Sequence, residues 1–154
     1  MILAVASESN MKPFVLLRIA SILTLLFAAG HTSGGLSLWS PAGETDVLRA
    51  MRSFHFDAAG TSRTYLDFYL GFGYILSVYL FAQAVVFWQL ASIAKSDAYR
   101  TRPLIGTFLL VAIASTVLSW RFIFVVPVIC SATISVCLAL AFFFSGKRGS
   151  GAAK

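Results

Sequence analysis

The chain has 154 residues, of which 58% are hydrophobic and 12% are charged, and its formal net charge is +6. Soluble domains carry about 25% charged residues, and a soluble chain of this size could not bury so much apolar surface in a single core. The composition therefore excludes an ordinary soluble domain and indicates an integral membrane protein.

The basic residues flank long apolar runs and do not alternate with aromatic residues on a polar surface. In a soluble protein, an excess of positive charge would suggest nucleic acid as a partner. Here the positive-inside rule and attraction to anionic lipid explain the charge better. We expect the lipid bilayer, and not nucleic acid, as the partner.

The first predicted membrane span covers residues 14–38, after a short N-terminal segment at residues 1–13. An apolar run that follows a basic residue can also be a secretory signal peptide. Arg18 lies inside the run and favours an uncleaved anchor. His31 follows Thr24 and Ala28 at helical spacing, so it is expected to point into the bundle near the far end of this span.

The long connection at residues 39–65 is predicted to contain a short amphipathic helix. Ser40 and Pro41 are typical of a helix start, and the segment 58–61 is expected to end the helix. Its apolar residues fall on one face, which indicates a helix that lies on the membrane surface or caps the bundle.

Three further spans are predicted at about residues 66–93, 104–120 and 122–144. Lys95, Arg100, Arg102 and Pro103 are interpreted as a short basic connection before the third span. Residues 14–144 are therefore predicted to form an all-α, integral membrane four-helix transmembrane bundle. The short amphipathic helix lies between the first and second spans.

Counting basic residues predicts the orientation of the spans. Eight lie on the N-terminal side of the predicted topology and four on the other side, which also holds four acidic residues. We expect a multi-pass protein of the bacterial inner (plasma) membrane, with both termini in the cytoplasm. Residues 145–154 are interpreted as a disordered cytoplasmic tail, and Met1 and Met11 are both possible starts.

The two cysteines, Cys130 and Cys137, lie seven residues apart in the last predicted span. On a regular helix this spacing separates them by roughly 10 Å along the axis, whereas a disulfide needs Cα atoms within about 7 Å. They are interpreted as small packing residues.

The predicted topology brings His31, Asp67 and Arg121 to one end of the bundle. A carboxylate at the edge of a bilayer needs a partner or a function, so Asp67 is expected to pair with His31 or Arg121. The ligand-binding candidates at this outer mouth are His31, Thr32, Arg63, Asp67, Tyr69 and Arg121. A structural interpretation stays open, in which Asp67 favours a helix N-terminus and His31 binds a carbonyl beside nearby glycines.

The sequence has no cluster of residues at metal-ligand spacing, and no phosphate-loop or hydrolase motif. No metal and no cofactor are predicted. A b-type haem would need axial histidines, and the chain has two, His31 and His55. Haem and quinone stay as alternatives.

The motif H-T-x-G-G closes the first span, and R-T-Y-x-D-F-Y-x-G-F-G opens the second. In this layout the chain resembles small four-span bacterial inner-membrane proteins, and in outline it is similar to DoxX-like proteins. The matching residues are His31, Thr32, Gly34, Gly35, Arg63, Tyr65, Asp67, Tyr69, Gly71 and Gly73. The resemblance implies a membrane protein and no particular reaction.

These observations favour a non-enzymatic accessory subunit or a binder of a lipid-like small molecule, either in a larger membrane complex or as a homo-oligomer. The first alternative is a membrane enzyme acting on a lipid or quinone, with His31 and Asp67 as proton-transfer groups. The second alternative is a small transporter or channel subunit. No charged residue lies near the middle of a predicted span, where the coupling residues of transporters usually lie, so the sequence gives this alternative less support.

Overall fold

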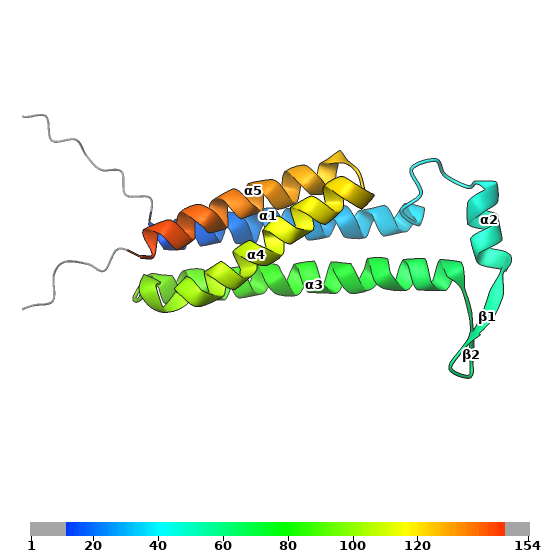
Figure 1. Cartoon of the computed structure of the whole chain (residues 1–154), viewed down its shortest axis with the longest axis horizontal. Helices are drawn as coiled ribbons and strands as arrows, with labels where there is room; N and C mark the ends of the chain where they lie inside the picture. The colour runs from blue at the N-terminus through cyan, green and yellow to red at the C-terminus, as the bar shows by residue number, and fades with distance from the viewer. Residues whose placement is uncertain (1–11, 147–154) are drawn as a thin grey trace, which may run out of the picture. The chain divides into compact units, whose positions relative to one another are not determined.

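Four long helices dominate the structure, a computed structural model that describes residues 12–146 (Figure 1). They are α1 (Pro13–Gly34), α3 (Tyr65–Ala94), α4 (Ala98–Phe122) and α5 (Val125–Phe144). Within the described residues, these four are long and apolar enough to cross a membrane, with mean hydropathies from 1.8 to 2.4. At most 33% of each apolar stretch is buried, which suits a lipid environment. The predicted all-α membrane fold is confirmed.

The start of the third span differs from the prediction. Helix α4 begins at Ala98, because the side chain of Asp97 accepts a hydrogen bond from the backbone N–H of Arg100 at 3.1 Å. Such an N-cap satisfies a donor that the first helical turn leaves free. The segment 100–103, predicted as a connection, therefore belongs to the first turns of α4.

The other bounds lie close to the predicted spans. Helix α1 ends at Gly34 and is followed by the 3-10 helix η1 (Gly35–Ser37). Helix α5 starts at Val125 and places Pro127 in its first turn, where a proline removes no hydrogen bond. The alternative starts at Met1 and Met11, and the tail beyond residue 146, lie outside the described residues.

The chain divides into two compact units. Residues 22–85 form the first, which we name the cap unit. The described residues 12–21 and 86–146 belong to the second, which we name the hairpin unit after its α4–α5 helical hairpin.

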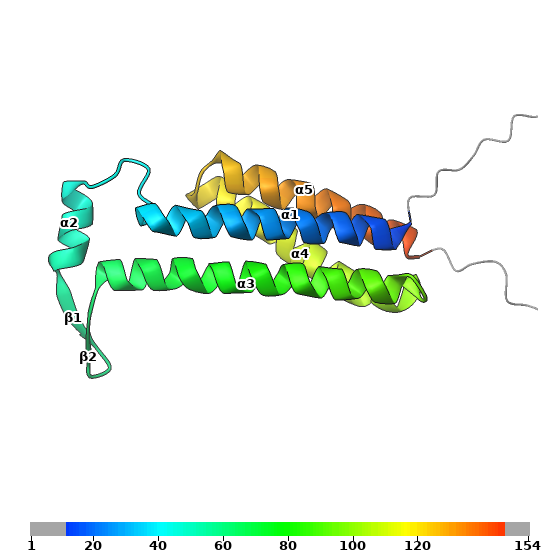
Figure 2. The same ribbon diagram turned by 180° about the vertical axis from the view of Figure 1, so that it is seen from behind.

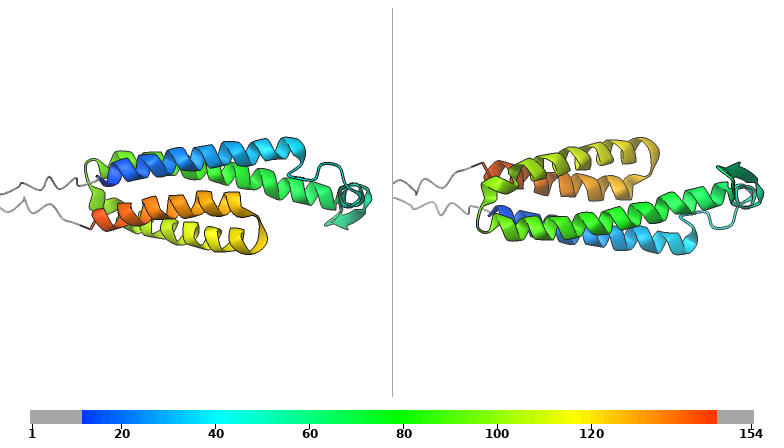
Figure 3. Two further views of the ribbon diagram at one scale, coloured as in Figure 1. Left: turned by 90° about the horizontal axis from the view of Figure 1, so that it is seen from above. Right: turned by 90° about the horizontal axis from the view of Figure 1, so that it is seen from below.

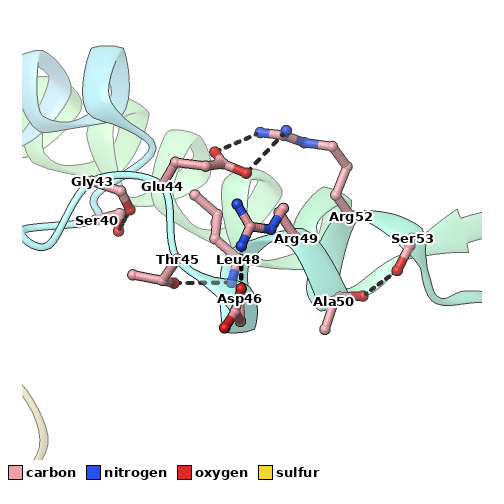
Figure 4. Close-up of polar contacts among 10 residues, drawn as sticks. All are labelled: Ser40, Gly43, Glu44, Thr45, Asp46, Leu48, Arg49, Ala50, Arg52 and Ser53. Atoms are coloured by element: carbon pink, nitrogen blue, oxygen red, sulfur yellow. Dashed lines mark hydrogen bonds and ion pairs between the residues drawn. The ribbon is translucent and has the colours of Figure 1, made fainter.

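In the cap unit, the second part of α1 and the first part of α3 run antiparallel (Figure 2). The connection between them contains η1, α2 (Asp46–Ser53), β1 (His55–Ala58) and β2 (Thr61–Thr64). Helix α2 is the predicted amphipathic helix, but Thr45 caps it and not Ser40. The hydroxyl of Thr45 accepts from the N–H of Leu48 at 3.1 Å. Ser40 instead donates to the carbonyl of Gly43 in a turn (Figure 4).

Helix α2 ends at Ser53 and not, as the sequence predicted, at the segment 58–61, and a two-stranded antiparallel hairpin follows it. Its turn residues, Ala59 and Gly60, have φ of 53° and 78°, and two positive φ values match the twist of a tight hairpin. Asp57 accepts a hydrogen bond from the N–H of Gly60 at 2.7 Å. The ring of Phe56 lies 4.9 Å from that of Tyr65, so the hairpin packs against the start of α3.

In the hairpin unit, α4 and α5 form the closest helix pair (Figure 3). Small and hydroxyl side chains allow this approach, as is usual between membrane helices. The hydroxyl of Thr116 donates to that of Ser131 at 3.0 Å, and Gly106 faces the ring of Phe142. Both cysteines are free thiols in α5.

Candidate functional site

The chain reverses direction after η1, and this reversal returns Trp39 to the helices of the cap unit. Leu38 and Trp39 have φ of 56° and 47°, a left-handed conformation that is uncommon for residues other than glycine. The N–H of Trp39 donates to the carbonyl of Gly34 at 2.9 Å. Backbone strain of this kind persists only where surrounding contacts hold it.

Three glycines form the surface against which the Trp39 ring packs. A Cβ atom added to Gly34 would lie 2.8 Å from Cδ1 of the ring, and one added to Gly35 would lie 3.0 Å from Cη2. A Cβ on Gly73 of α3 would come closer still. Hydrogen is therefore the only side chain that fits unaltered at Gly73, and the ring joins α1 to α3. We name this arrangement the Trp39 seat.

His31 belongs to the Trp39 seat. Its ring lies 5.2 Å from the Trp39 ring, and its Nε2 lies 3.1 Å from the carbonyl oxygen of Gly73. Because a carbonyl only accepts, Nε2 carries the proton and donates. The indole N–H of Trp39 donates in turn to the carbonyl of His31 at 2.8 Å. The structural interpretation expected a carbonyl beside the glycines that neighbour His31 in sequence, whereas the carbonyl in the structure belongs to Gly73 of α3.

Two tyrosines of α3 complete the seat. The hydroxyl of Tyr69 donates to the carbonyl of Trp39 at 3.1 Å, and the ring of Tyr74 lies edge-on to the indole at 5.0 Å. Tyr69, a predicted site residue, thus holds the strained reversal in place.

Asp67 begins α3 with a reciprocal pair of hydrogen bonds. The N–H of Thr64 donates to the carboxylate at 2.8 Å, and the N–H of Asp67 donates to the hydroxyl of Thr64 at 3.1 Å. This capping box satisfies donors that a helix start leaves free. Among the described residues, no ion pair joins Asp67 to His31 or to an arginine.

The remaining predicted site residues are distributed over different elements. Thr32 donates to the carbonyl of Ala28 at 2.7 Å. Arg63 lies on β2 and donates to the carbonyl of Ser62. Arg121 is in the last turn of α4, within the hairpin unit, with its guanidinium over the ring of Phe122.

An open groove of about 380 Å³ lies between α1 and α3 in the cap unit. Leu25, Leu36 and Phe81 provide its large apolar side chains, and Ala28 and Ala29 also line it. Along α1 the lining residues extend from position 25 to 33, which corresponds to about 12 Å at 1.5 Å per residue, and Leu36 of η1 lines the groove beyond the end of α1. We name this feature the α1/α3 groove.

Three hydroxyl groups line the same groove, from Thr32, Ser33 and Ser77. Each donates its proton to a backbone carbonyl of its own helix, at 2.7, 2.8 and 3.3 Å respectively. A hydroxyl has one donor and two acceptor lone pairs. The polar part of the groove therefore offers acceptors to a ligand.

Sequence reasoning missed Trp39 and most of the groove. Two adjacent glycines, Gly34 and Gly35, precede a tryptophan after a short segment, and this spacing is the available signal for a ring folded onto glycines. Within residues 12–146, no three His, Cys, Asp or Glu side chains gather where they could hold a metal ion.

No protein-family model, no curated protein and no solved structure matches the chain. The fold nevertheless defines its class, which is a small multi-pass integral membrane protein.

Proposed function

We propose that the protein binds a lipid-like small molecule in the α1/α3 groove, and that it acts without catalysing a reaction. The observation that carries the proposal is the groove itself, an apolar recess with hydroxyl groups on a helix pair suited to a membrane. Its volume of about 380 Å³ falls in the range of about 300–1,000 Å³ typical of small-molecule sites.

The shape of the groove suits one apolar chain. It follows α1 for about 12 Å, which is less than half of a hydrocarbon core about 30 Å thick. Leu25 and Phe81 lie at one end, and Thr32 and Ser33 lie about two helical turns further along α1. A ligand would place its apolar tail beside Leu25 and its polar group beside the hydroxyls.

The hydrogen bonds within the groove narrow the class of ligand. Since Thr32, Ser33 and Ser77 use their protons on backbone carbonyls, the matching head group is a donor, such as the hydroxyl of a monoacylglycerol or a long-chain alcohol. Quinone carbonyls only accept hydrogen bonds, so they complement these three groups less well.

The Trp39 seat supports the same proposal because it fixes the separation of the two helices that form the groove. It ties α1 to α3 through the contact of His31 with Gly73, one turn from the Ser77 side of the groove. A groove needs walls with a fixed separation if it is to select its ligand.

The cellular setting is part of the proposal. The count of basic residues favours cytoplasmic termini and places the connection 35–64 outside. The DoxX-like layout favours a bacterial inner membrane. In that membrane the protein would serve as an accessory subunit of a larger complex or as a homo-oligomer.

Photo-crosslinking tests the groove directly. A monoacylglycerol that carries a diazirine in its acyl chain is added to membranes containing the full chain, and labelled peptides are identified by mass spectrometry. We expect labels at Leu25 and Phe81. Ala29→Phe should reduce labelling at least about fivefold, because the phenyl ring would occupy space in the groove that the ligand needs.

Ala82→Phe is the matched control, since Ala82 is exposed on α3 and does not line the groove. It should label like the original chain. Equal labelling of the Ala29→Phe and Ala82→Phe variants would contradict the proposal, as would labels spread evenly over all four helices.

A further inference from the structure

We propose a second lipid contact, in the hairpin unit: Arg18 and Lys95 together bind the phosphate of an anionic phospholipid head group. These two residues lie on the start of α1 and just beyond the end of α3. The proposal is independent of the α1/α3 groove, whose lining residues all belong to the cap unit.

Each cation lies on an aromatic ring of the other helix. The guanidinium of Arg18 is 3.3 Å from the centre of the Trp88 ring, and Nη2 donates to the hydroxyl of Ser92 at 3.0 Å. The ammonium of Lys95 is 5.5 Å from the centre of the Phe14 ring.

The spacing of these residues aligns the two cations. Phe14 and Arg18 are four residues apart on α1, and Trp88, Ser92 and Lys95 follow one another at intervals of four and three. Such intervals place side chains on one helical face, one turn apart. Arg18 and Lys95 therefore lie one above the other on a single seam between α1 and α3.

Within residues 12–146, no carboxylate pairs with Arg18 or Lys95. Asp97 is the only acidic residue among the described residues of the hairpin unit, and it pairs with Arg100 at 3.1 Å. Nη1 of Arg18 is buried and has no hydrogen-bond partner in the described part of the chain. An aromatic face attracts a cation but leaves its N–H donors largely unused, and a charged donor without a partner is costly in a low-dielectric setting.

The seam is open on the side where a lipid would approach. Trp88 is 50% exposed, and Ser92 and Lys95 are exposed. Arg18 is five residues after Pro13, about 7.5 Å along the helix, which is close enough to the start of the span for its long side chain to reach the head-group region. The buried Nη1 is out of reach of a lipid, but a phosphate has several acceptor oxygens and can bind the remaining N–H of Nη2 of Arg18 and the exposed ammonium of Lys95.

Native mass spectrometry of the full chain in mild detergent tests the proposal. Phosphatidylglycerol and phosphatidylcholine with identical acyl chains are titrated, and inorganic phosphate is added in a separate arm. We expect phosphatidylglycerol to bind at least about fivefold more tightly than phosphatidylcholine. Arg18→Gln and Lys95→Gln should each remove about fivefold of that affinity, the typical effect of one basic residue near an anionic surface.

Arg121→Gln removes the same charge from the last turn of α4 and should leave phosphatidylglycerol binding unchanged. Ala29→Phe should leave it unchanged as well, which separates this site from the groove. Because Lys95 is exposed, its variant stays informative even if Arg18→Gln fails to fold.

Three results would overturn the proposal. They are equal binding of the two lipids, wild-type binding by Lys95→Gln, and displacement of phosphatidylglycerol by an equal concentration of inorganic phosphate. The last result would identify a soluble phosphate compound, not a lipid, as the ligand.

Discussion

The arginine side chains of the two units have different kinds of partner. In the cap unit, Arg49 pairs with Asp46, and Arg52 lies 3.4 Å from the carboxylate of Glu44 (Figure 4). In the hairpin unit, Arg18 lies on the ring of Trp88 and pairs with no carboxylate of the described residues. The connection around α2 thus largely neutralises its own charge, whereas the seam of the hairpin unit keeps positive charge available for lipid.

The units also differ in how their helices are held together. In the cap unit, one large side chain, Trp39, bridges α1 and α3 across three glycines. In the hairpin unit, many small contacts along α4 and α5 share that role, such as the one between Thr116 and Ser131. Stability in the cap unit should therefore depend on few residues, and in the hairpin unit on many.

Replacement of Trp39 should lower the free energy of unfolding more than the other replacements proposed below. Trp39→Ala empties the seat, removes the indole hydrogen bond to His31 and releases the strained reversal. We expect a loss of about 2–4 kcal/mol in the free energy of unfolding, somewhat below the range for fully buried tryptophan because Trp39 is half-buried. Thermal unfolding in detergent measures the loss, and hydrogen exchange should show faster exchange in residues 65–85.

Trp120→Ala is the matched control in the hairpin unit, because Trp120 is 78% exposed. Its effect should stay within about 0.5 kcal/mol. Similar losses for the two variants would mean that Trp39 does not bridge the helices as described.

Replacing two glycines of α3 by alanine should change the free energy of unfolding in opposite directions. A Cβ at Gly73 would collide with the Trp39 ring, whereas a Cβ at Gly71 would meet nothing within 4 Å. Gly71→Ala should raise the free energy of unfolding by about 0.5–1 kcal/mol, the difference in helix propensity. Gly73→Ala should lower it by about 1–3 kcal/mol, since the overpacked ring must shift.

Chemical unfolding in the same detergent measures both variants. If both replacements raise the free energy of unfolding of the protein, the Trp39 ring is not held against α3.

The membrane spans could be predicted from the sequence because lipid imposes a simple rule, which is a long apolar run. The predicted start of the third span was wrong because a polar N-cap precedes a proline. Asp97 starts α4 before Pro103, although the proline suggested a connection. The hairpin at residues 55–64 was missed because Ala59 adopts a positive φ, which no sequence rule favours for alanine.

The candidate site was predictable in part. The sequence singled out His31 and suggested a carbonyl partner near it in the chain, but it did not indicate the carbonyl of Gly73 on α3. Trp39 was not found, since its position depends on a left-handed reversal at Leu38 and Trp39 that has no glycine to mark it. The groove depends on the spacing of two helices, which a one-dimensional pattern does not contain.

Asp67 should have a smaller effect on stability than Trp39 or Gly73, and it separates the structural interpretation from the enzymatic alternative. Asp67→Ala removes the acceptor for the N–H of Thr64 and should cost about 1 kcal/mol, as for other lost caps. Asp67→Asn keeps an acceptor oxygen and should cost less, within about 0.5 kcal/mol. Asp97→Ala, which removes the cap of α4 in the hairpin unit, should cost about as much as Asp67→Ala.

A proton-transfer role for Asp67 predicts a different pattern, because an amide keeps the cap but cannot exchange a proton at neutral pH. Thermal unfolding and labelling by the diazirine monoacylglycerol, measured on the same Asp67→Asn sample, distinguish the two roles. With a capping role alone, labelling persists, and no chemically altered lipid is found with either the original chain or the variant. If the original chain converts its bound lipid and Asp67→Asn stops the conversion without a change in stability, Asp67 acts in chemistry, and the proposal of a non-enzymatic binder is wrong.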